Sequence, residues 1–274
     1  MQIGTLEFDI PVVMGILNVT PDSFADGGRF LAPADAMRQA EAMADAGAAI
    51  IDVGGESTRP GAADVSEQEE MDRVVPIIAA IHKSLDVSVS VDTSKASVMR
   101  AAVGAGADMI NDVRALREAG ALDAAVDLQK PVCLMHMQGQ PRTMQENPLY
   151  KDVTAEVAEF LEDRIRVCVA AGLNRELIIV DPGFGFGKSH SHNVELLANL
   201  RQLRDLGQPL LVGISRKSTL GHLTGRIAGD RLPASIAAAV VAVTSGAQIV
   251  RVHDVAETVD ALKVGRAVME AAAN

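Results

Sequence analysis

The chain has 274 residues, 48% of them hydrophobic and 22% charged, a balance that excludes a disordered, fibrous or collagen-like protein. Its formal net charge of −11 repels nucleic acid and anionic membranes, and 3% aromatic residues with no Trp leave few surfaces for base stacking. We therefore expect neither a nucleic-acid nor a membrane partner. The length suits one large domain, because α/β barrels often reach about 250 residues as a single unit.

Residues 2–9 come first and alternate Ile3, Leu6 and Phe8 with polar neighbours. This pattern predicts a small β-hairpin that closes the lower end of the fold. Short apolar runs rich in β-branched residues then predict eight strands. They span residues 12–17, 49–53, 87–91, 109–110, 132–135, 177–180, 210–214 and 249–252.

Amphipathic segments with apolar residues every three or four positions lie between these strands and predict helices. The clearest span residues 34–46, 66–85, 153–171, 192–206 and 255–272. Strands that are apolar throughout indicate a parallel sheet covered on both faces. Their ends recur about every 34 residues, which favours a single-domain (β/α)8 barrel over residues 1–274. The alternative is an open doubly wound sheet, but the turn after the first strand lacks the GxGxxG that such a sheet often carries.

The cysteines and the amino-terminal residues indicate in which cellular compartment the protein is expected. Cys133 and Cys168 are the two cysteines, and neither CxxC nor Cys/His spacing surrounds them, so we expect buried reduced thiols. The amino-terminal segment carries Glu7 and Asp9 and no basic stretch before an apolar one. No apolar run reaches the about 18 residues of a membrane span. We expect a cytoplasmic protein.

Polar residues end all eight predicted strands. They are Asn18, Asp52, Asp92, Asn111 with Asp112, His136, Asp181, Ser215 to Ser218, and Arg251 with His253. In a barrel the carboxyl ends of the strands meet at one mouth. Strand capping explains any one of these residues, but buried charges are costly unless paired, and so many together favour a polar ligand.

The residue types at this mouth indicate the kind of ligand. Asp92, Asn111 and Asp181 offer acceptors and one amide donor, which suit an electron-poor heterocycle with ring N–H and amino groups. The cations suit an anion, and they are Arg59, Arg216, Lys217, Arg251 and His253. A guanidinium can also stack on a ring, and Arg251 is the expected platform. The sequence thus predicts a flat heterocycle that bears phosphate.

Three loops complete this interpretation. Residues 20–28 and 54–62 combine glycine, hydroxyl groups and charge, and we expect mobile lids in preference to plain turns. Residues 182–189 nearly spell a P-loop, but Pro182 occupies the first glycine position and has no N–H for a phosphate. This segment is instead expected to expose Phe186 toward a substrate and Lys188 to solvent, while His136 is expected to be a structural or supporting residue.

Six motifs resemble those of the bacterial dihydropteroate synthases, and the likeness covers nearly the whole chain. They are residues 14–24 (MGILNVTPDSF), 52–61 (DVGGESTRPG), 90–93 (SVDT), 181–188 (DPGFGFGK), 215–218 (SRKS) and 251–254 (RVHD). The resemblance implies a (β/α)8 barrel that joins 6-hydroxymethyl-7,8-dihydropterin pyrophosphate to 4-aminobenzoate, releasing 7,8-dihydropteroate and pyrophosphate for folate synthesis. It also implies sensitivity to sulfonamides, which mimic the aminobenzoate, and a homodimer.

The resemblance also implies roles for individual residues. The pterin would contact Asp92, Asn111, Met135, Asp181, Lys217 and Arg251. The pyrophosphate would contact Asn18, Arg251 and His253, with Asn18 as a ligand of Mg²⁺. The aminobenzoate would contact Phe24, Thr58, Arg59, Pro60, Phe186, Lys217 and Ser218. The first lid has Ala25 where many relatives carry Ser, which puts one lid hydroxyl contact in doubt.

The implied reaction needs no covalent enzyme nucleophile. Mg²⁺, Arg251 and His253 would neutralise the departing pyrophosphate. Asp92 and Asp181 would favour the pterin cation, and the aminobenzoate amine would then attack. Asp92, Lys217, Arg251 and His253 are therefore the expected catalytic residues. Two alternatives remain: a Schiff-base aldolase that uses Lys217, and a non-catalytic pterin-binding barrel or folate-dependent methyl-carrier partner.

Overall fold

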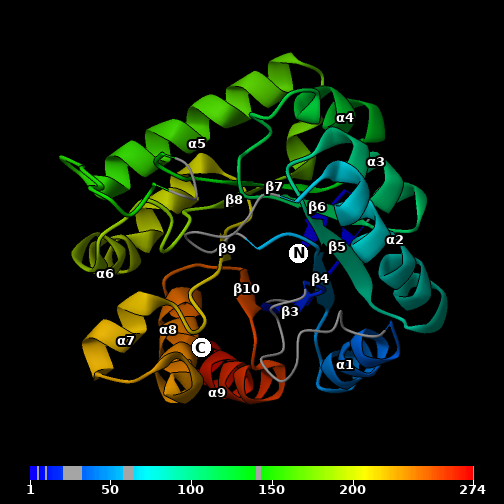
Figure 1. Cartoon of the computed structure of the whole chain (residues 1–274). Coiled ribbons are helices and arrows are strands. Elements are labelled where there is room, and N and C mark those ends of the chain that lie inside the picture. Colours follow the sequence, from blue (N-terminus) through cyan, green and yellow to red (C-terminus); the bar gives the residue numbers. More distant parts are fainter. Residues whose placement is uncertain (5, 10, 21–32, 58–64, 140–142, 274) are drawn as a thin grey trace.

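The barrel strands of the computed structural model are parallel and form one ring (Figure 1). The structure describes residues 1–4, 6–9, 11–20, 33–57, 65–139 and 143–273. The ring strands are β3 (Val12–Asn18), β4 (Ile50–Gly54), β5 (Ser88–Asp92), β6 (Met109–Asp112), β7 (Val132–Met135), β8 (Ile178–Asp181), β9 (Leu211–Val212) and β10 (Ile249–Val252). Their order is β8-β7-β6-β5-β4-β3-β10-β9, and a parallel bridge from Val180 to Leu210 joins β8 to the start of β9. The (β/α)8 barrel is confirmed, and the doubly wound alternative is wrong.

Apolar side chains close the amino-terminal end of the ring. Strands β1 (Gln2–Ile3) and β2 (Leu6–Glu7) pair antiparallel, as the alternation of residues 2–9 predicts. Ile3 is buried among inward-facing side chains near the starts of the ring strands. Its cluster comprises Val12, Met14, Ile50, Met109, Cys133, Ile179, Leu211 and Ile249. The hairpin therefore covers an apolar floor inside the barrel.

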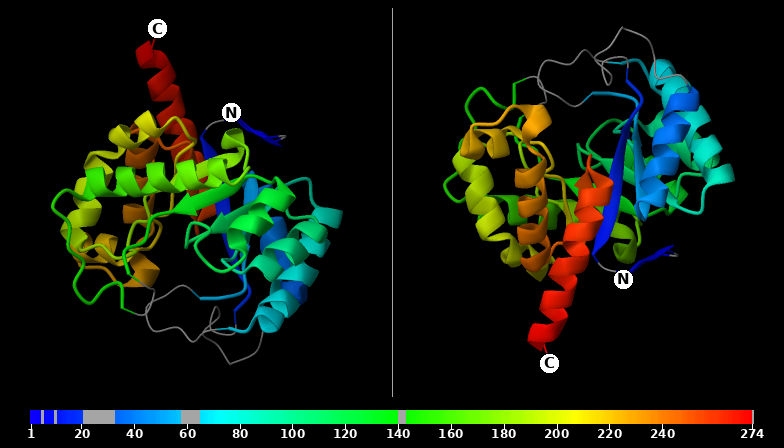
Figure 2. Two further views of the ribbon diagram at one scale, coloured as in Figure 1. Left: turned by 90° about the horizontal axis from the view of Figure 1, so that it is seen from above. Right: turned by 90° about the horizontal axis from the view of Figure 1, so that it is seen from below.

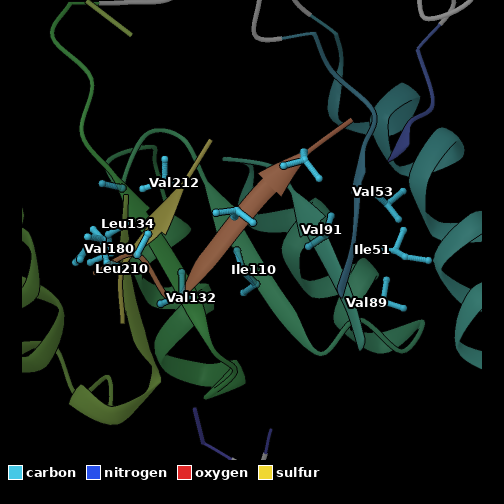
Figure 3. Close-up of a cluster of buried hydrophobic side chains, with 14 of the residues drawn as sticks. Ile51, Val53, Val89, Val91, Ile110, Val132, Leu134, Val180, Leu210 and Val212 are labelled. Atoms are coloured by element: carbon cyan, nitrogen blue, oxygen red, sulfur yellow. The ribbon is translucent and has the colours of Figure 1, made fainter. Parts of the chain in front are cut away.

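The outward faces of the strands form a second apolar layer beneath the helices (Figure 3). The labelled side chains are Ile51, Val53, Val89, Val91, Ile110, Val132, Leu134, Val180, Leu210 and Val212, all of them buried. Side chains alternate across a strand, so Ile51 and Val53 face the helices while Ile50 and Asp52 face the interior. The interior therefore changes from apolar at the floor to polar at the mouth, whereas the labelled side chains keep the helical side apolar along the strands.

Helices surround the ring in the described part of the chain (Figure 1). They are α1 (Pro33–Asp45), α2 (Glu67–Ser84), α3 (Ala96–Gly104), α4 (Ala121–Leu128), α5 (Val153–Ala170), α6 (His190–Ala198), α7 (Ser218–Thr224), α8 (Leu232–Thr244) and α9 (Val255–Ala273). Short 3₁₀ helices are η2 (Arg175–Leu177), η3 (Leu200–Leu206) and η4 (Ala228–Asp230). The carboxyl end of α9 extends past the rest of the molecule, on the side where the chain begins (Figure 2). No helix among the described residues is long and apolar enough to cross a membrane.

The largest differences between predicted and observed elements lie between residues 192 and 214. The helix predicted over residues 192–206 is wrong as one element, because α6 ends at Ala198 and a 3₁₀ helix follows. Its buried Leu200 and Leu203 are three residues apart, the spacing that a 3₁₀ helix places on one side. The strand predicted over residues 210–214 shortens to Leu211–Val212.

Candidate active site

Five inward-facing side chains from separate strands meet at the carboxyl end of the barrel. They are Asp52 on β4, Asp92 on β5, Asn111 on β6, Asp181 on β8 and Arg251 on β10. Arg251 donates through Nε to Asp52 Oδ2 at 2.6 Å and through Nη2 to Asp92 Oδ2 at 2.8 Å. Asn111 Nδ2 donates to the same Asp52 oxygen at 3.0 Å. Arg251, Asp52, Asp92 and Asn111 thus form one hydrogen-bonded cluster at the predicted mouth.

Burial and charge set the protonation of this cluster. Desolvation raises the pKa of Asp92 to about 7, although the Arg251 guanidinium works to lower it. For the cation Arg251, burial has the opposite effect and lowers the pKa. The charges of Asp52 and Asp92 outweigh burial, so the pKa of Arg251 is raised. Arg251 is therefore charged, and the Asp92 carboxyl can change its protonation near neutral pH.

Asp181 occupies the opposite side of the ring, close to Lys217. Its Oδ1 accepts a hydrogen bond from the Gly183 N–H at 2.7 Å. Burial raises the pKa of Asp181 to about 6, opposed by this hydrogen bond and by the charges of Lys217 and Lys188. Lys217 Nζ lies 4.2 Å from the centroid of the Phe186 ring. Lys217 therefore joins the carboxylate side of the mouth to the glycine-rich loop.

Phe186 does not have the exposure that the sequence predicts. Its side chain is 8% exposed and packs with four apolar side chains, Val113, Met135, Met137 and Met144. The ring is buried because the loop turns inward at Gly183, Gly185 and Gly187, which have φ of +69°, +79° and +61°. Met135, predicted to pack in the pterin pocket, belongs to this cluster.

Lys188 is not in solvent, as the sequence predicts, but 2% exposed. Its ammonium donates to the carbonyl oxygens of Gly183 at 2.9 Å and Phe186 at 3.1 Å, and lies 2.8 Å from His136 Nδ1. The loop carbonyls supply the partners that water would otherwise give, so the lysine can be buried. Burial lowers the pKa of Lys188 to about 7, opposed by the charge of Asp181.

His136 supports the loop from below, which matches its prediction as a structural or supporting residue. Its backbone N–H donates to the Asp181 carbonyl at 2.9 Å, and its ring lies edge-on to Phe160 at 4.9 Å. Burial and the Lys188 charge lower the pKa of His136 to about 2. The imidazole is therefore neutral, and its Nδ1 can accept a hydrogen bond from Lys188.

Replacing Gly183 by alanine is expected to destabilise the protein strongly. A methyl group there would lie 1.9 Å from the His136 carbonyl oxygen, and the φ of +69° is itself unfavourable for alanine. We expect the free energy of unfolding in urea to fall by about 3 kcal/mol or more. Gly207→Ala is the matched control, because it has a φ of +70° but no atom within 4 Å of the added methyl group. Equal losses in the two variants would contradict the contact argument.

His253 and Asn18 lie on the β10 and β3 side of the mouth. Ser215 Oγ is 3.0 Å from His253 Nδ1 and accepts the His253 backbone N–H at 3.3 Å, which fixes the imidazole. Burial, followed by the charge of Arg251, lowers the pKa of His253 to about 4. Asn18 ends β3 beside Gly54, and a methyl group on that glycine would lie 3.4 Å from Asn18 Oδ1 and 3.5 Å from Asp92 Cβ. Asn18 and Asp92 are therefore neighbours across β4.

Some predicted residues have other partners or lie outside the described ranges. Arg216 pairs with Asp254, and the Asp112 carboxylate accepts the N–H groups of Arg114 and Leu116 at 2.8 Å, so strand capping explains that aspartate. Ser218 is the exposed first residue of α7, next to Lys217. The predicted contacts Phe24, Thr58, Arg59 and Pro60 lie outside the described residues, as does Ala25.

The residues at the mouth fit a magnesium ion that arrives with a phosphate. The described residues contain no group of three or more His, Cys, Asp or Glu side chains that could enclose a metal. They offer instead the amide oxygen of Asn18 beside Asp92. Mg²⁺ commonly takes one or two protein oxygens and completes its shell with water and substrate phosphates.

Two residues of this site were not given a role from the sequence. Asp52 lies within β4, two residues before its carboxyl end at Gly54. A charged residue in an otherwise apolar strand is the signal that identifies it, but its contacts to Arg251 and Asn111 cannot be inferred from sequence spacing. The sequence contains no signal for the burial of Lys188, because a lysine after a glycine-rich run can lie either in solvent or in a buried turn.

A ring of parallel strands with paired, buried charges at its carboxyl ends defines a barrel enzyme that binds a small polar ligand. Comparison with known proteins is more specific. The family model described as "Pterin binding enzyme" matches residues 14–253. The dihydropteroate synthase of Escherichia coli K12 is 53% identical over 270 residues, 98% of this chain and 96% of that protein.

Solved structures agree with the sequence match. The dihydropteroate synthase of Yersinia pestis, solved with a sulfonamide drug complex, has a TM-score of 0.95 and 52% identity, covering 98% of this chain and 99% of that one. The Xanthomonas albilineans enzyme in complex with 7,8-dihydropteroate has a TM-score of 0.88 and 49% identity, covering 96% and 95%. The chain belongs to the family of pterin binding enzymes, among its dihydropteroate synthases. Membership favours this transferase over the aldolase and the non-catalytic alternatives.

Proposed function

We propose that the chain condenses 6-hydroxymethyl-7,8-dihydropterin pyrophosphate with 4-aminobenzoate to give 7,8-dihydropteroate and pyrophosphate. The observation that carries the proposal is the cluster in which Arg251 joins Asp52 and Asp92 while Asn111 donates to Asp52. It combines acceptors for ring N–H groups with a fixed cation beside them. Relatives with dihydropteroate or a sulfonamide bound support the same substrates for this chain.

The pterin ring would lie across the carboxylates at the mouth. Asp92 and Asp181 would accept its N–H groups, and the Asn111 amide would accept another, because its nitrogen already donates to Asp52. Met135 would contact the ring from the apolar cluster, Lys217 would donate to its edge, and Arg251 would stack on its face.

The diphosphate would be held on the β3 and β10 side. Arg251 and His253 would donate to its oxygens, and Asn18 would hold Mg²⁺ through its amide oxygen. When bound, the ion would neutralise part of the diphosphate charge. His253 is uncharged near neutral pH, because its pKa is about 4, so it would act as a hydrogen-bond donor through Nε2 while Nδ1 faces Ser215.

The reaction would break the bond between the pterin methylene carbon and the bridging oxygen, and the electron pair would leave with pyrophosphate. Arg251 would stabilise the charge that develops on that oxygen. The carboxylates of Asp92 and Asp181 would stabilise the delocalised pterin cation. The amine of 4-aminobenzoate would then form the new C–N bond and release a proton, and no enzyme nucleophile takes part.

The aminobenzoate would bind where the glycine-rich loop meets α7. Phe186 and Lys217 would contact its ring, and Ser218 would face its carboxylate from the start of the helix. Four further contacts predicted from the sequence, Phe24, Thr58, Arg59 and Pro60, lie outside the described residues. A sulfonamide would compete at the same place. We also propose that the enzyme works as a homodimer in the cytoplasm.

Pyrophosphate release tests the proposed function directly. The protein is incubated with dihydropterin pyrophosphate, with and without 4-aminobenzoate and with and without Mg²⁺. We expect release that needs Mg²⁺ and is accompanied by dihydropteroate when aminobenzoate is present. Pterin binding without release under every condition would contradict the proposal and favour a non-catalytic pterin-binding barrel.

The affinity for the pterin substrate is expected to fall in acid. Asp92 must be ionised to accept a ring N–H, and burial raises its pKa to about 7, so protonation removes an acceptor as the pH drops below that value. We expect KM for the pterin substrate to rise by up to tenfold per unit below about pH 7. Steady-state rates between pH 5.5 and 8.5 measure this. In Asp92→Asn the change near pH 7 should disappear and leave only the weaker effect of Asp181, whose pKa burial raises to about 6. A change near pH 7 that persists in this variant would assign that titration to another group.

A further inference from the structure

Asp52 is fully buried inside the barrel, one inward position below the mouth. Its register partner on β5 is Ser90, whereas Gly54, two residues further along β4, pairs with Asp92. The side chain has no exposed surface. Asp52 therefore lies behind the residues that face the ligand and acts on it only through them.

One oxygen of Asp52 holds two ligand-facing side chains from distant parts of the chain. Arg251 Nε on β10 and Asn111 Nδ2 on β6 both donate to Oδ2, at 2.6 and 3.0 Å. These strands lie on opposite sides of β4 in the ring order. The carboxylate thus couples two parts of the site that share no direct hydrogen bond in the described residues.

The contact to Asn111 decides which end of that amide meets the ligand. The amide nitrogen donates to Asp52, and reversing the amide would turn its oxygen against a carboxylate, which is repulsive. Asn111 therefore presents its oxygen to the mouth. A ligand at this position must supply an N–H donor.

The contact to Arg251 fixes the plane of the guanidinium. Nε reaches Asp52 while Nη2 reaches Asp92, so two bonds to two carboxylates hold one rigid group. If the guanidinium were bonded to Asp92 alone, it could rotate about that one hydrogen bond. The flat face that would stack on the pterin is therefore placed by Asp52.

Stability alone is a poor explanation for this carboxylate. Among the described residues, Asp52 Oδ1 is buried with no hydrogen-bond partner. A buried acceptor without a partner costs free energy, and an apolar residue of similar size would avoid that cost. The geometry is better explained by what Asp52 does to its neighbours.

We propose that Asp52 is a positioning residue that orients Arg251 and Asn111 and thereby selects pterins that present an N–H donor to the Asn111 oxygen. This inference rests on the proposed function, since it concerns how the same site recognises the pterin. It assigns Asp52 no contact with the substrate. The proposal therefore predicts that replacing Asp52 changes the KM for dihydropterin pyrophosphate and not the KM for 4-aminobenzoate.

The negative charge of Asp52 gives the proposal a second readout. It is one of the groups that raise the pKa of Asp92, after burial and against the effect of Arg251. Neutralising Asp52 lowers that pKa, so pterin binding persists to lower pH. A change that only loosened the fold would affect both substrates, so this shift is read together with the KM for 4-aminobenzoate.

The test is Asp52→Asn, which keeps the shape of the side chain and removes its charge. We expect KM for dihydropterin pyrophosphate to rise at least tenfold, KM for 4-aminobenzoate to stay within twofold, and the acid limb of the pterin KM to move to lower pH. Binding of 6-hydroxymethylpterin measured by calorimetry should weaken in parallel. This measurement needs no turnover, so it tests Asp52 even if the wild-type protein released no pyrophosphate.

Asp108→Asn is the matched control. Asp108 Oδ2 accepts the Val89 N–H at 2.9 Å near the floor, far along the strands from the mouth, and has no part in the site. We expect this variant to lose stability in urea and to keep both KM values and the pH profile. If Asp52→Asn behaved in the same way, or if it raised both KM values equally with an unmoved acid limb, Asp52 would be a structural residue and the proposal would be wrong.

Discussion

Replacing Lys217 by alanine is expected to abolish turnover and to weaken pterin binding about 100-fold, or about 2.7 kcal/mol. The variant loses the ammonium that lies 4.2 Å from the Phe186 ring centroid. It also loses one of the charges that lower the pKa of Asp181, so that carboxyl, with its pKa already raised to about 6, would be protonated more at neutral pH. One substitution therefore removes a donor and weakens an acceptor. Pyrophosphate release and calorimetry with 6-hydroxymethylpterin measure the two effects.

Lys263→Ala is the control for this variant. Lys263 lies on α9 with its side chain 72% exposed, and its removal should leave both measurements unchanged. A Lys217→Ala enzyme with a near-normal rate would refute the assigned role. Trapping of substrate on Lys217 by borohydride, with no release of pyrophosphate, would instead favour a Schiff-base aldolase.

Replacing Arg251 by alanine is expected to cost the most stability of any change at the mouth. It leaves the carboxylates of Asp52 and Asp92 buried without their counter-ion, for which we expect a loss of about 3–5 kcal/mol in the free energy of unfolding. Both pterin and pyrophosphate binding should weaken as well. A loss confined to one ligand would contradict the double role of this residue.

The stability loss should depend on pH in a defined direction. Arg251 lowers the pKa of Asp92, so its removal raises that pKa further above about 7. The folded state then keeps a proton that the unfolded state, with a pKa near 3.8, releases, and stability falls as the pH rises through this window. Urea unfolding of Arg251→Ala should show a smaller deficit at pH 5.5 than at pH 8. Arg266→Ala, on the exposed face of α9, should leave the urea midpoint unchanged at both values.

Apolar periodicity was enough to predict the barrel. Strands such as Ile50–Gly54 and Ser88–Asp92 are predicted within one residue of their bounds, because buried runs of β-branched residues mostly form strands. The mouth followed from the same pattern, since parallel strands bring their polar ends together. The break at Asn199 within the predicted helix over 192–206 could not be read, because Leu200 and Leu203 suit α-helical and 3₁₀ spacing alike.

The contacts within the mouth could not be predicted in the same way. Sequence spacing placed Arg251 near a ligand but did not show that Asp52 and Asp92 hold it, because that depends on the stagger of strands far apart in the chain. The burial of Lys188 was missed for a related reason. It depends on a loop in which the Gly183 and Phe186 carbonyl groups point at the ammonium, and a glycine-rich sequence alone does not reveal such a turn.

The hydrocarbon floor makes the barrel a cup instead of a channel. Ile3, Met14 and Met109 fill the lower interior, so substrates and products must pass each other through the upper rim. Under the proposed function, both substrates would therefore enter, and both products leave, by the same opening.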